Sequence, residues 1–326
     1  MRDSVDDTLG PKGAANRSMI IGQAMDITDP MSWAQAEELL TKAGWTVRDL
    51  PRGQVMLDVT DGPELGTLLD SRPASGEEVD GHGMLRAAGG GALDFALAKS
   101  VTADVEVEEV MVGFNWTYVR AGPYCGIARS PERGTEGART ARTGMPIAGR
   151  PLGALARWLC SLDPLRRSIG LAAVNAFWNR PDGPTAKRKW GLSRFDPPGD
   201  GLVIIGGFRA AAARLPNATI VEREPKGDDV PAGRARDALA GTTAIAITAQ
   251  ALMNGSLEPL LARSKHIPIR FLVGPSAPVA EVALNHGPTV IAGLAITDPD
   301  AARAFIAESG TMIALDHMIR TLEVER

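Results

Sequence analysis

The sequence is poor in cysteine: its 326 residues include only Cys125 and Cys160. Two cysteines cannot build the framework of several disulfide bonds that holds small secreted domains together. A chain of this length can bury a large apolar core without such cross-links. A reducing compartment is the simplest environment for it, and we therefore expect a cytoplasmic protein.

The sequence also lacks an excess of positive charge. Its 39 Asp and Glu residues outnumber its 35 Lys and Arg residues, so the formal net charge is -4. Binding to nucleic acid needs a basic face, and contact with an anionic membrane commonly uses a cluster of basic residues. The composition argues against both partners and leaves a small molecule as the expected one.

Long apolar runs are missing. No stretch approaches the roughly 20 apolar residues that a membrane-spanning helix needs, and the run LVIIGGF is short enough for a buried strand. Residues 1–18 are polar and carry no apolar segment of the kind found in a secretory signal. We expect a soluble protein with a disordered tail over residues 1–18.

Motifs that mark common catalytic and metal sites are absent as well. The 4 His residues fit no zinc-ligand spacing, and the two cysteines form no Cys-x-x-Cys pair. There is no G-x-S-x-G elbow and no Walker A loop. Cys125, in an apolar strand, is more often a small hydrophobic residue than a nucleophile. We predict no metal site of the protein's own and leave open whether the protein is an enzyme.

Before residue 180 the pattern is that of a mixed α+β region. A helix is predicted over 83–100, or only after Gly91, because each of the three glycines 89–91 costs about 1 kcal/mol in a helix. Asp163 can cap a helix that begins at Pro164. The other predicted elements are a helix from Ser32, strands at 45–48, 54–59, 105–112, 115–119 and 124–128, a mobile loop at 129–150, and helices at 151–162 and 164–179.

Beyond a linker at 181–200, rich in Pro, Gly and charge, short apolar strands alternate with helices. Strands that are apolar on both faces indicate a parallel sheet covered on both sides. We therefore predict an α/β protein in which a Rossmann-like, doubly wound domain (201–326) follows a smaller α+β domain (19–180). The predicted strands are 202–206, 219–221, 244–248, 269–273 and 289–292, and the predicted helices are 208–214, 232–240, 256–264, 278–285 and 298–308.

In an open parallel sheet, ligands bind outside the carboxyl ends of the strands. Gly206 and Gly207 end the first predicted strand and let a ligand approach the backbone, although a plain tight turn is the alternative. Glu222 ends the second, as a ribose-binding acid or a solvated one. Asn254 can face the ligand or cap a helix. Gly274, Pro275 and Ser276 follow the fourth strand.

Several strings together resemble a known family. VEEVMVGFNWTYV, GPYCGIARSP and RPLGALARWLCSLDPLRRSIGLAAVNAFWN are similar to the strand pair and helices of the putative heavy-metal chelation family. IVEREPKGDDVP, ITAQALMNGSLEPLL, FLVGPSAPV and IAGLAI follow in the order of that family's second half. The resemblance covers about residues 84–315, and residues 19–82 match nothing in it.

The resemblance implies an enolase N-terminal-like α+β domain, extended by the unplaced residues 19–82, ahead of the Rossmann-like domain, with a ligand cleft between the two. Because the family's Rossmann half is similar to methyltransferases, S-adenosylmethionine is one nucleotide-type candidate for an otherwise unidentified cofactor. The implied ligand-binding residues are Asn115, Trp116, Thr117, Asn175, Asn179, Gly206, Gly207, Glu222, Arg223, Asn254, Gly274, Pro275 and Ser276.

Two functions follow as hypotheses. The first is binding and processing, by condensation, hydrolysis or group transfer, of a metal-chelating or pterin-, flavin- or siderophore-like metabolite. The second is a non-catalytic protein that carries or senses a metal chelate, with the metal arriving already chelated. The fold cannot decide between them, because Rossmann-like domains host many functions. A homodimer is a frequent assembly for proteins of this kind.

Overall fold

The computed structural model describes residues 91–132, 147–161, 163–185, 191–206, 208–310 and 317–326, and three short strands before them. The predicted helix from Ser32 and most of the predicted loop 129–150 lie outside the described residues, as do almost all of the predicted tail and Gly207. In the described part, no helix has both the length and the apolar character that crossing a membrane requires.

The three N-terminal strands form a small antiparallel sheet in the order β1-β3-β2. They are β1 (Ser18–Ile20), β2 (Asp49–Leu50) and β3 (Gln54–Asp58). β3 matches the strand predicted at 54–59, whereas β2 begins after the strand predicted at 45–48, which is outside the described residues.

A second antiparallel sheet carries helices on one face. Its strands are β4 (Glu109–Val112), β5 (Trp116–Ala121) and β6 (Tyr124–Arg129), joined in the order β4-β5-β6. The helices are α5 (Ala92–Ser100), α6 (Leu152–Ala156), the 3-10 helix η2 (Arg157–Cys160) and α7 (Pro164–Trp178). The helix predicted over 151–162 is thus divided, and α5 begins after Gly91, as the shorter alternative predicted.

Helix α7 begins where the sequence predicted. The carboxylate of Asp163 accepts hydrogen bonds from the backbone N–H groups of Leu165 and Arg166, at 2.9 and 3.1 Å, and Pro164 is the first helical residue. This cap satisfies donors that the first turn leaves unpaired. At Gly126 on β6, a Cβ atom would overlap the backbone of Ala176, so glycine lets this helix lie directly on the strand.

The third sheet has seven strands in the order β13-β12-β11-β10-β7-β8-β9. All neighbours are parallel except β13, which pairs antiparallel with β12. The strands are β7 (Leu202–Ile205), β8 (Thr219–Glu222), β9 (Val230–Pro231), β10 (Ala244–Thr248), β11 (Ile269–Val273), β12 (Val290–Ile296) and β13 (Ile319–Glu325). The five predicted strands are present, while β9 and β13 were not predicted.

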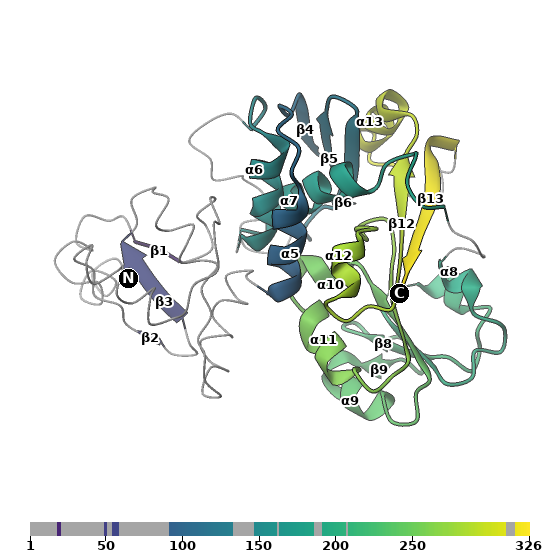
Figure 1. The fold of residues 1–326 in the computed structure, drawn as a ribbon. Coiled ribbons are helices and arrows are strands. Elements are labelled where there is room, and N and C mark those ends of the chain that lie inside the picture. Colours follow the sequence, from purple (N-terminus) through teal and green to yellow (C-terminus); the bar gives the residue numbers. More distant parts are fainter. Residues whose placement is uncertain are drawn as a thin grey trace.

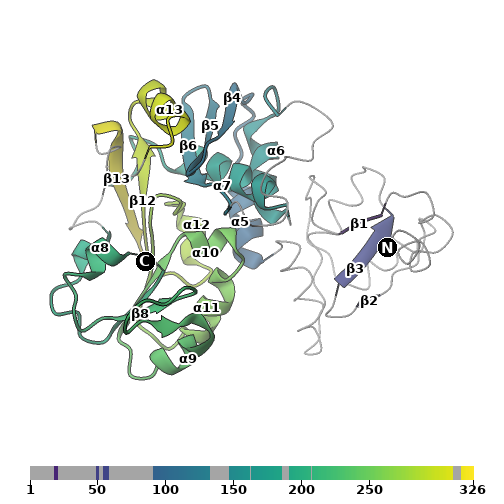
Figure 2. The ribbon, with the colours of Figure 1, turned by 180° about the vertical axis from the view of Figure 1, so that it is seen from behind.

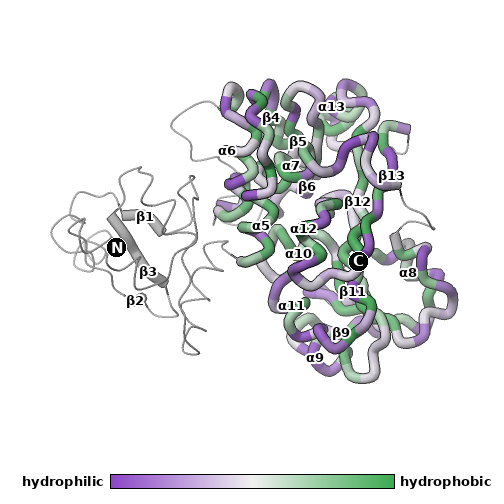
Figure 3. The backbone as a smooth tube through the Cα atoms, viewed as in Figure 1, coloured by the Kyte–Doolittle hydropathy of each residue, from purple (hydrophilic) through white to green (hydrophobic). Residues whose placement is uncertain are grey.

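Both faces of this sheet are covered, as the sequence predicted. On one face, Val203, Ile245 and Leu272 pack against α9 to α12, and on the other Ile204 and Phe271 pack against α8 and the 3-10 helix η3 (Gly191–Arg194). In Figure 3 the middle of the sheet is correspondingly green along β11 and β12. The helices are α8 (Arg209–Ala212), α9 (Ala235–Ala238), α10 (Gln250–Met253), α11 (Leu257–Arg263), α12 (Glu281–Leu284) and α13 (Pro299–Ala307).

The β4–β6 sheet with its helices lies at one end of the seven-stranded sheet, beside α13 (Figures 1 and 2). This end holds the carboxyl ends of the parallel strands, because Trp116 and Ile127 pack against Leu294 and Ile296 in the last half of β12. One cluster of buried apolar side chains runs without interruption from α5 and α7 into the large sheet. The division into two domains with a linker at 181–200 therefore stays a prediction.

Candidate functional site

The strand order changes direction between β7 and β10. From β7 the chain moves outward to β8 and β9, and it then returns to build β10, β11 and β12 on the other side of β7. Such a switch point leaves a crevice outside the carboxyl ends of the two strands, which is where open α/β sheets bind ligands. In this chain the two strand ends are Ile205-Gly206 and Thr248.

Gly206 is required by the backbone at that point. Its φ angle is 104°, in the region that favours glycine, and a Cβ atom there would lie 2.5 Å from Cγ2 of Thr248. The residue thus lets the end of β7 pass close to the end of β10. Its predicted neighbour in the site, Gly207, lies outside the described residues.

The segment that follows β6 reaches over the carboxyl ends of the large sheet. The backbone N–H of Arg129 donates a hydrogen bond to Oγ of Ser276, three residues after β11, at 2.8 Å. Farther along, the carboxylate of Glu132 forms an ion pair with Arg223, just after β8, at 2.6 Å. These contacts bring polar groups from β6, β8 and the loop after β11 to one edge of the sheet.

Asn115, Trp116 and Arg129 form a stack at this edge. The guanidinium of Arg129 lies 5.5 Å from the centre of the Trp116 ring, and its Nη1 donates to Oδ1 of Asn115 at 3.0 Å. Asn115 in turn donates through Nδ2 to the backbone oxygen of Ser309. Burial lowers the pKa of the Arg129 guanidinium from its usual value, and the charge of Glu132 opposes this shift.

Asn175 lies on α7 and Asn179 is the residue that caps its C-terminal end; their side chains bind backbone groups of β6 and of the loop after β11. Asn175 donates through Nδ2 to the carbonyl oxygens of Ile127 and Ser276, at 2.8 and 3.2 Å. Asn179 donates to the oxygen of Ala277 and accepts from the N–H of Val279, both at 2.8 Å. Both residues are 1% exposed, so in this structure they hold the two sheets together.

Thr117 faces the interior of the β4–β6 unit. Its hydroxyl lies 3.1 Å from that of Ser130 and accepts from the hydroxyl of Ser168 at 2.6 Å. The side chain is fully buried, so its hydroxyl forms these hydrogen bonds inside the unit and is not exposed at the strand ends. This hydroxyl cluster fixes the end of β6 just before the segment that crosses the strand ends.

Of the remaining predicted residues, Glu222, Gly274 and Pro275 lie at the carboxyl ends of strands, whereas Asn254 does not. Glu222 ends β8, is half-buried, and accepts a hydrogen bond from the N–H of Arg223 at 3.1 Å. Gly274, with φ of 130°, and Pro275 lead from β11 to Ser276. Asn254 is different: α10 separates it from β10, it is exposed, and its Oδ1 accepts from the N–H and hydroxyl of Ser256.

Sequence reasoning missed Arg129, Glu132 and Thr248. Arg129 was assigned to a mobile loop because the segment that follows is rich in Gly, Arg and Thr. In the structure it is the last residue of β6, paired opposite Trp116. Extending the predicted strand by one residue would have placed it at the same edge as Asn115 and Trp116, which were predicted.

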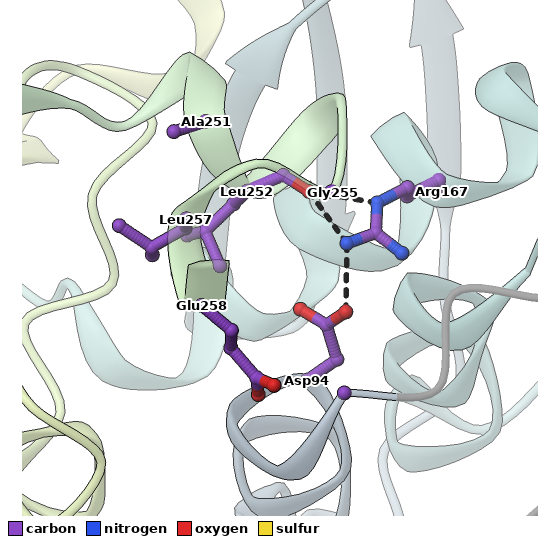
Figure 4. Close-up of a pocket in the computed structure, with 8 residues that line it drawn as sticks. Asp94, Arg167, Ala251, Leu252, Gly255, Leu257 and Glu258 are labelled. Atoms are coloured by element: carbon purple, nitrogen blue, oxygen red, sulfur yellow. Dashed lines mark hydrogen bonds and ion pairs between the residues drawn. The ribbon is translucent and has the colours of Figure 1, made fainter. Parts of the chain in front are cut away.

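A second polar cluster is buried between α5, α7 and the segment from α10 to α11 (Figure 4). Nη2 of Arg167 donates to Asp94 at 2.7 Å and to the carbonyl oxygen of Leu252, and Glu258 accepts from the N–H of Leu93 at the start of α5. Burial raises the pKa of Asp94 to about 6, against the effect of Arg167. The cavity beside them measures about 10 Å³, room for one water molecule at most.

The described residues offer little for covalent or metal chemistry. Among them, no group of three His, Cys, Asp or Glu side chains is placed to hold a metal ion. Burial raises the pKa of the Cys125 thiol to about 12, so the reactive thiolate does not form near neutral pH. The thiol of Cys125 is therefore a packed side chain, consistent with its place in the apolar strand β6.

Comparison with known proteins identified a family for two parts of the chain. Two family models match, over residues 95–178 and 193–324, and both are described as "Putative heavy-metal chelation". No curated protein matches the chain.

Solved structures share the fold. One is a protein of unknown function from Desulfitobacterium hafniense, assigned to the family of the second model: it is 24% identical, has a TM-score of 0.61, and the match covers 72% of this chain and 97% of that one. Another, from Pyrococcus horikoshii and also of unknown function, is 19% identical, has a TM-score of 0.62, and the match covers 72% and 100%. At these identities the likeness shows the α/β fold alone.

Proposed function

Because the chain belongs to the family described as putative heavy-metal chelation, we propose that it binds a small metal-chelating metabolite at the carboxyl ends of β7, β8, β10 and β11. The observation that carries the proposal is the convergence at this edge. The switch point between β7 and β10 lies there, and the segment after β6 is held over it by the Arg129–Ser276 and Glu132–Arg223 contacts.

The ligand, and not the protein, supplies the donor atoms to the metal in this proposal. The described residues hold no cluster of three metal-binding side chains. They do offer groups that recognise an organic molecule: the backbone at Gly206, the Glu222 carboxylate, and the guanidinium and indole groups of Arg129 and Trp116. The polar groups of a chelating metabolite that do not face the metal are the ones that such side chains can bind.

Chemical processing of the ligand is the second candidate, and Glu222 favours it. Its carboxylate ends β8 at the edge of the sheet, is half-buried, and has no ion pair with any of the described residues. The charge of Arg209 acts on Glu222, but the guanidinium of Arg209 is paired with Asp229. A carboxylate that is not itself ion-paired can accept a proton from a bound molecule. Glu222 would then act as a base, while Gly206 admits the ligand to the backbone.

The experiment is a thermal-shift titration against S-adenosylmethionine, dinucleotides, pterins, flavins, free metal ions and metal–chelate complexes. A ligand present at a hundred times its dissociation constant adds about 2.7 kcal/mol of stability, which moves the midpoint by several degrees. Stabilisation by a metal–chelate complex, without a shift from the free metal, supports the proposal. Stabilisation by S-adenosylmethionine or a dinucleotide alone would replace it with an enzyme that uses that cofactor.

A further inference from the structure

Arg129 is a half-buried cation without a carboxylate partner in the described part of the chain. Within those residues, no Asp or Glu oxygen lies within 4 Å of its guanidinium. The nearest carboxylate in the sequence, that of Glu132, is engaged with Arg223. Buried arginines are nearly always paired, since an isolated charge is costly to remove from water. An anion is the partner that this position lacks.

The guanidinium is also held in one orientation. Its face lies over the Trp116 ring, and its Nη1 is fixed by Asn115, whose own amide is fixed by Ser309. Nε and Nη2 make no hydrogen bond to the described residues. In a guanidinium the N–H groups of Nε and Nη2 point the same way, as a fork that matches the two oxygens of a carboxylate or phosphate.

A second donor in the same stack also lacks an acceptor. Nε1 of Trp116 is buried and has no hydrogen-bond partner among the described residues. A buried N–H without an acceptor costs free energy that a bound oxygen atom would recover. The guanidinium edge and the indole N–H belong to two side chains in contact, so one oxygen-rich group is the simplest partner for both.

We propose that the Nε–Nη2 edge of Arg129 binds an oxyanion, a carboxylate or a phosphate group, of the ligand at the strand ends. The inference rests on the proposed function and specifies its ligand class. The metabolite carries at least one carboxylate or phosphate group that does not ligate the metal. Arg129 is the residue that selects it, and Trp116 and Asn115 position Arg129.

The test measures binding of citrate and of pyrophosphate by calorimetry to the wild-type protein and to Arg129→Gln and Arg129→Lys. We expect one of these anions to bind, and Arg129→Gln to raise its dissociation constant about 10- to 100-fold, the usual effect of losing a charge-assisted pair. Lysine keeps the charge but not the fork, so Arg129→Lys falls between the two. The preference between the anions tells a carboxylate from a phosphate.

The matched control is Arg263→Gln, which removes the same charge from an exposed position at the end of α11. Its dissociation constants should stay within twofold of the wild type. A second variant, Trp116→Phe, keeps the ring beneath the guanidinium and removes the indole N–H. Trp116→Phe should raise the dissociation constant of the anion less than Arg129→Gln does. The unfolding midpoint of each variant shows whether the variant is folded.

Two outcomes would overturn the inference. One is a folded Arg129→Gln protein that binds citrate and pyrophosphate as tightly as the wild type. The other is a wild-type protein that binds neither anion, while a metal–chelate complex without a free oxyanion stabilises it in the thermal-shift titration. The second outcome leaves the proposed function standing and removes only the role of Arg129. A protein that no probe stabilises contradicts both.

Discussion

Gly206 and Thr248 lie against each other at the ends of β7 and β10, so closely that a Cβ atom on Gly206 would be 2.5 Å from Cγ2 of Thr248. The contact is formed where the strand order changes direction, which is where this fold binds ligands. The glycine lets the two strands converge, and in the proposed function it also lets the ligand approach the backbone.

Replacing Gly206 with alanine should destabilise the protein by roughly 2–4 kcal/mol, because the methyl group meets Thr248 and φ is positive. Urea unfolding measures the change. Gly241→Ala is the control, since φ there is 72° but nothing lies within 4 Å of the added Cβ. The double variant Gly206→Ala/Thr248→Ser, which removes the clashing methyl group, should regain part of the loss. No recovery would show that the clash is not the cause.

Asn179→Ala should cost about 2–4 kcal/mol of stability. The substitution leaves the buried carbonyl of Ala277 and the N–H of Val279 without partners, and each such group costs about 1–3 kcal/mol. Asn217→Ala is the matched control, because the Asn217 side chain is exposed and its hydrogen bond goes to the exposed Asp200; its effect should stay below about 0.5 kcal/mol. Equal effects of the two variants would contradict the role assigned to Asn179.

Glu222→Ala should weaken ligand binding and leave the stability nearly unchanged, within about 0.5 kcal/mol, because the side chain is half-exposed and outside the core. The ligand that stabilises the wild type in the thermal-shift titration is the probe, and chemical unfolding measures stability. Glu224→Ala removes the same charge from an exposed position two residues away and should leave binding unaffected. A large loss of stability with unchanged binding would make Glu222 a structural residue.

The buried carboxyl of Asp94 should make the protein less stable as pH rises from about 4 to 6. Burial raises its pKa to about 6 in the folded state, above the value of 3.8 in the unfolded state. Between these values the folded state holds the proton more tightly, so raising the pH favours unfolding, by at most about 1.4 kcal/mol per pH unit.

Urea unfolding from pH 4 to pH 8 checks this slope, and Asp94→Asn is the comparison because it cannot titrate. The stability of the wild type relative to Asp94→Asn should fall across the window and then level off above pH 6. A relative stability that rises over the same window would mean that Arg167 lowers the pKa of Asp94 below its usual value.

The purified protein should contain less than one tightly bound transition-metal ion per chain. The described residues bring no three His, Cys, Asp or Glu side chains together, and the cysteine and histidine spacings fit no ligand motif. Elemental analysis after dialysis without a chelator gives the ratio. Stoichiometric zinc, nickel or iron would show that the protein itself ligates the metal and would replace the proposal that the metal arrives chelated.

The sequence predicted those helices and strands that are marked by a short apolar run or by a capping residue. The apolar runs at 244–248 and 269–273 became β10 and β11 with the same bounds, and the Asp163-Pro164 pair began α7. β13 was missed, although it covers the edge of the sheet beside β12. Its sequence, IRTLEVE, alternates weakly between apolar and charged residues, as an edge strand that is half-exposed does, and so lacks the continuous apolar run by which the parallel strands were recognised.

The candidate site shows the same division between local and long-range information. The sequence by itself determined that Gly206, Glu222 and Ser276 follow buried strands, because burial and glycine content are properties of short segments. Only the tertiary structure decided that Asn175 and Asn179 hold the loop after β11, and that Arg129 stacks on Trp116 beside Asn115. The two asparagine contacts join residues about a hundred positions apart, while Arg129 meets Asn115, 14 positions away, only because β5 and β6 pair in this register. No local pattern records which distant group a polar side chain will meet.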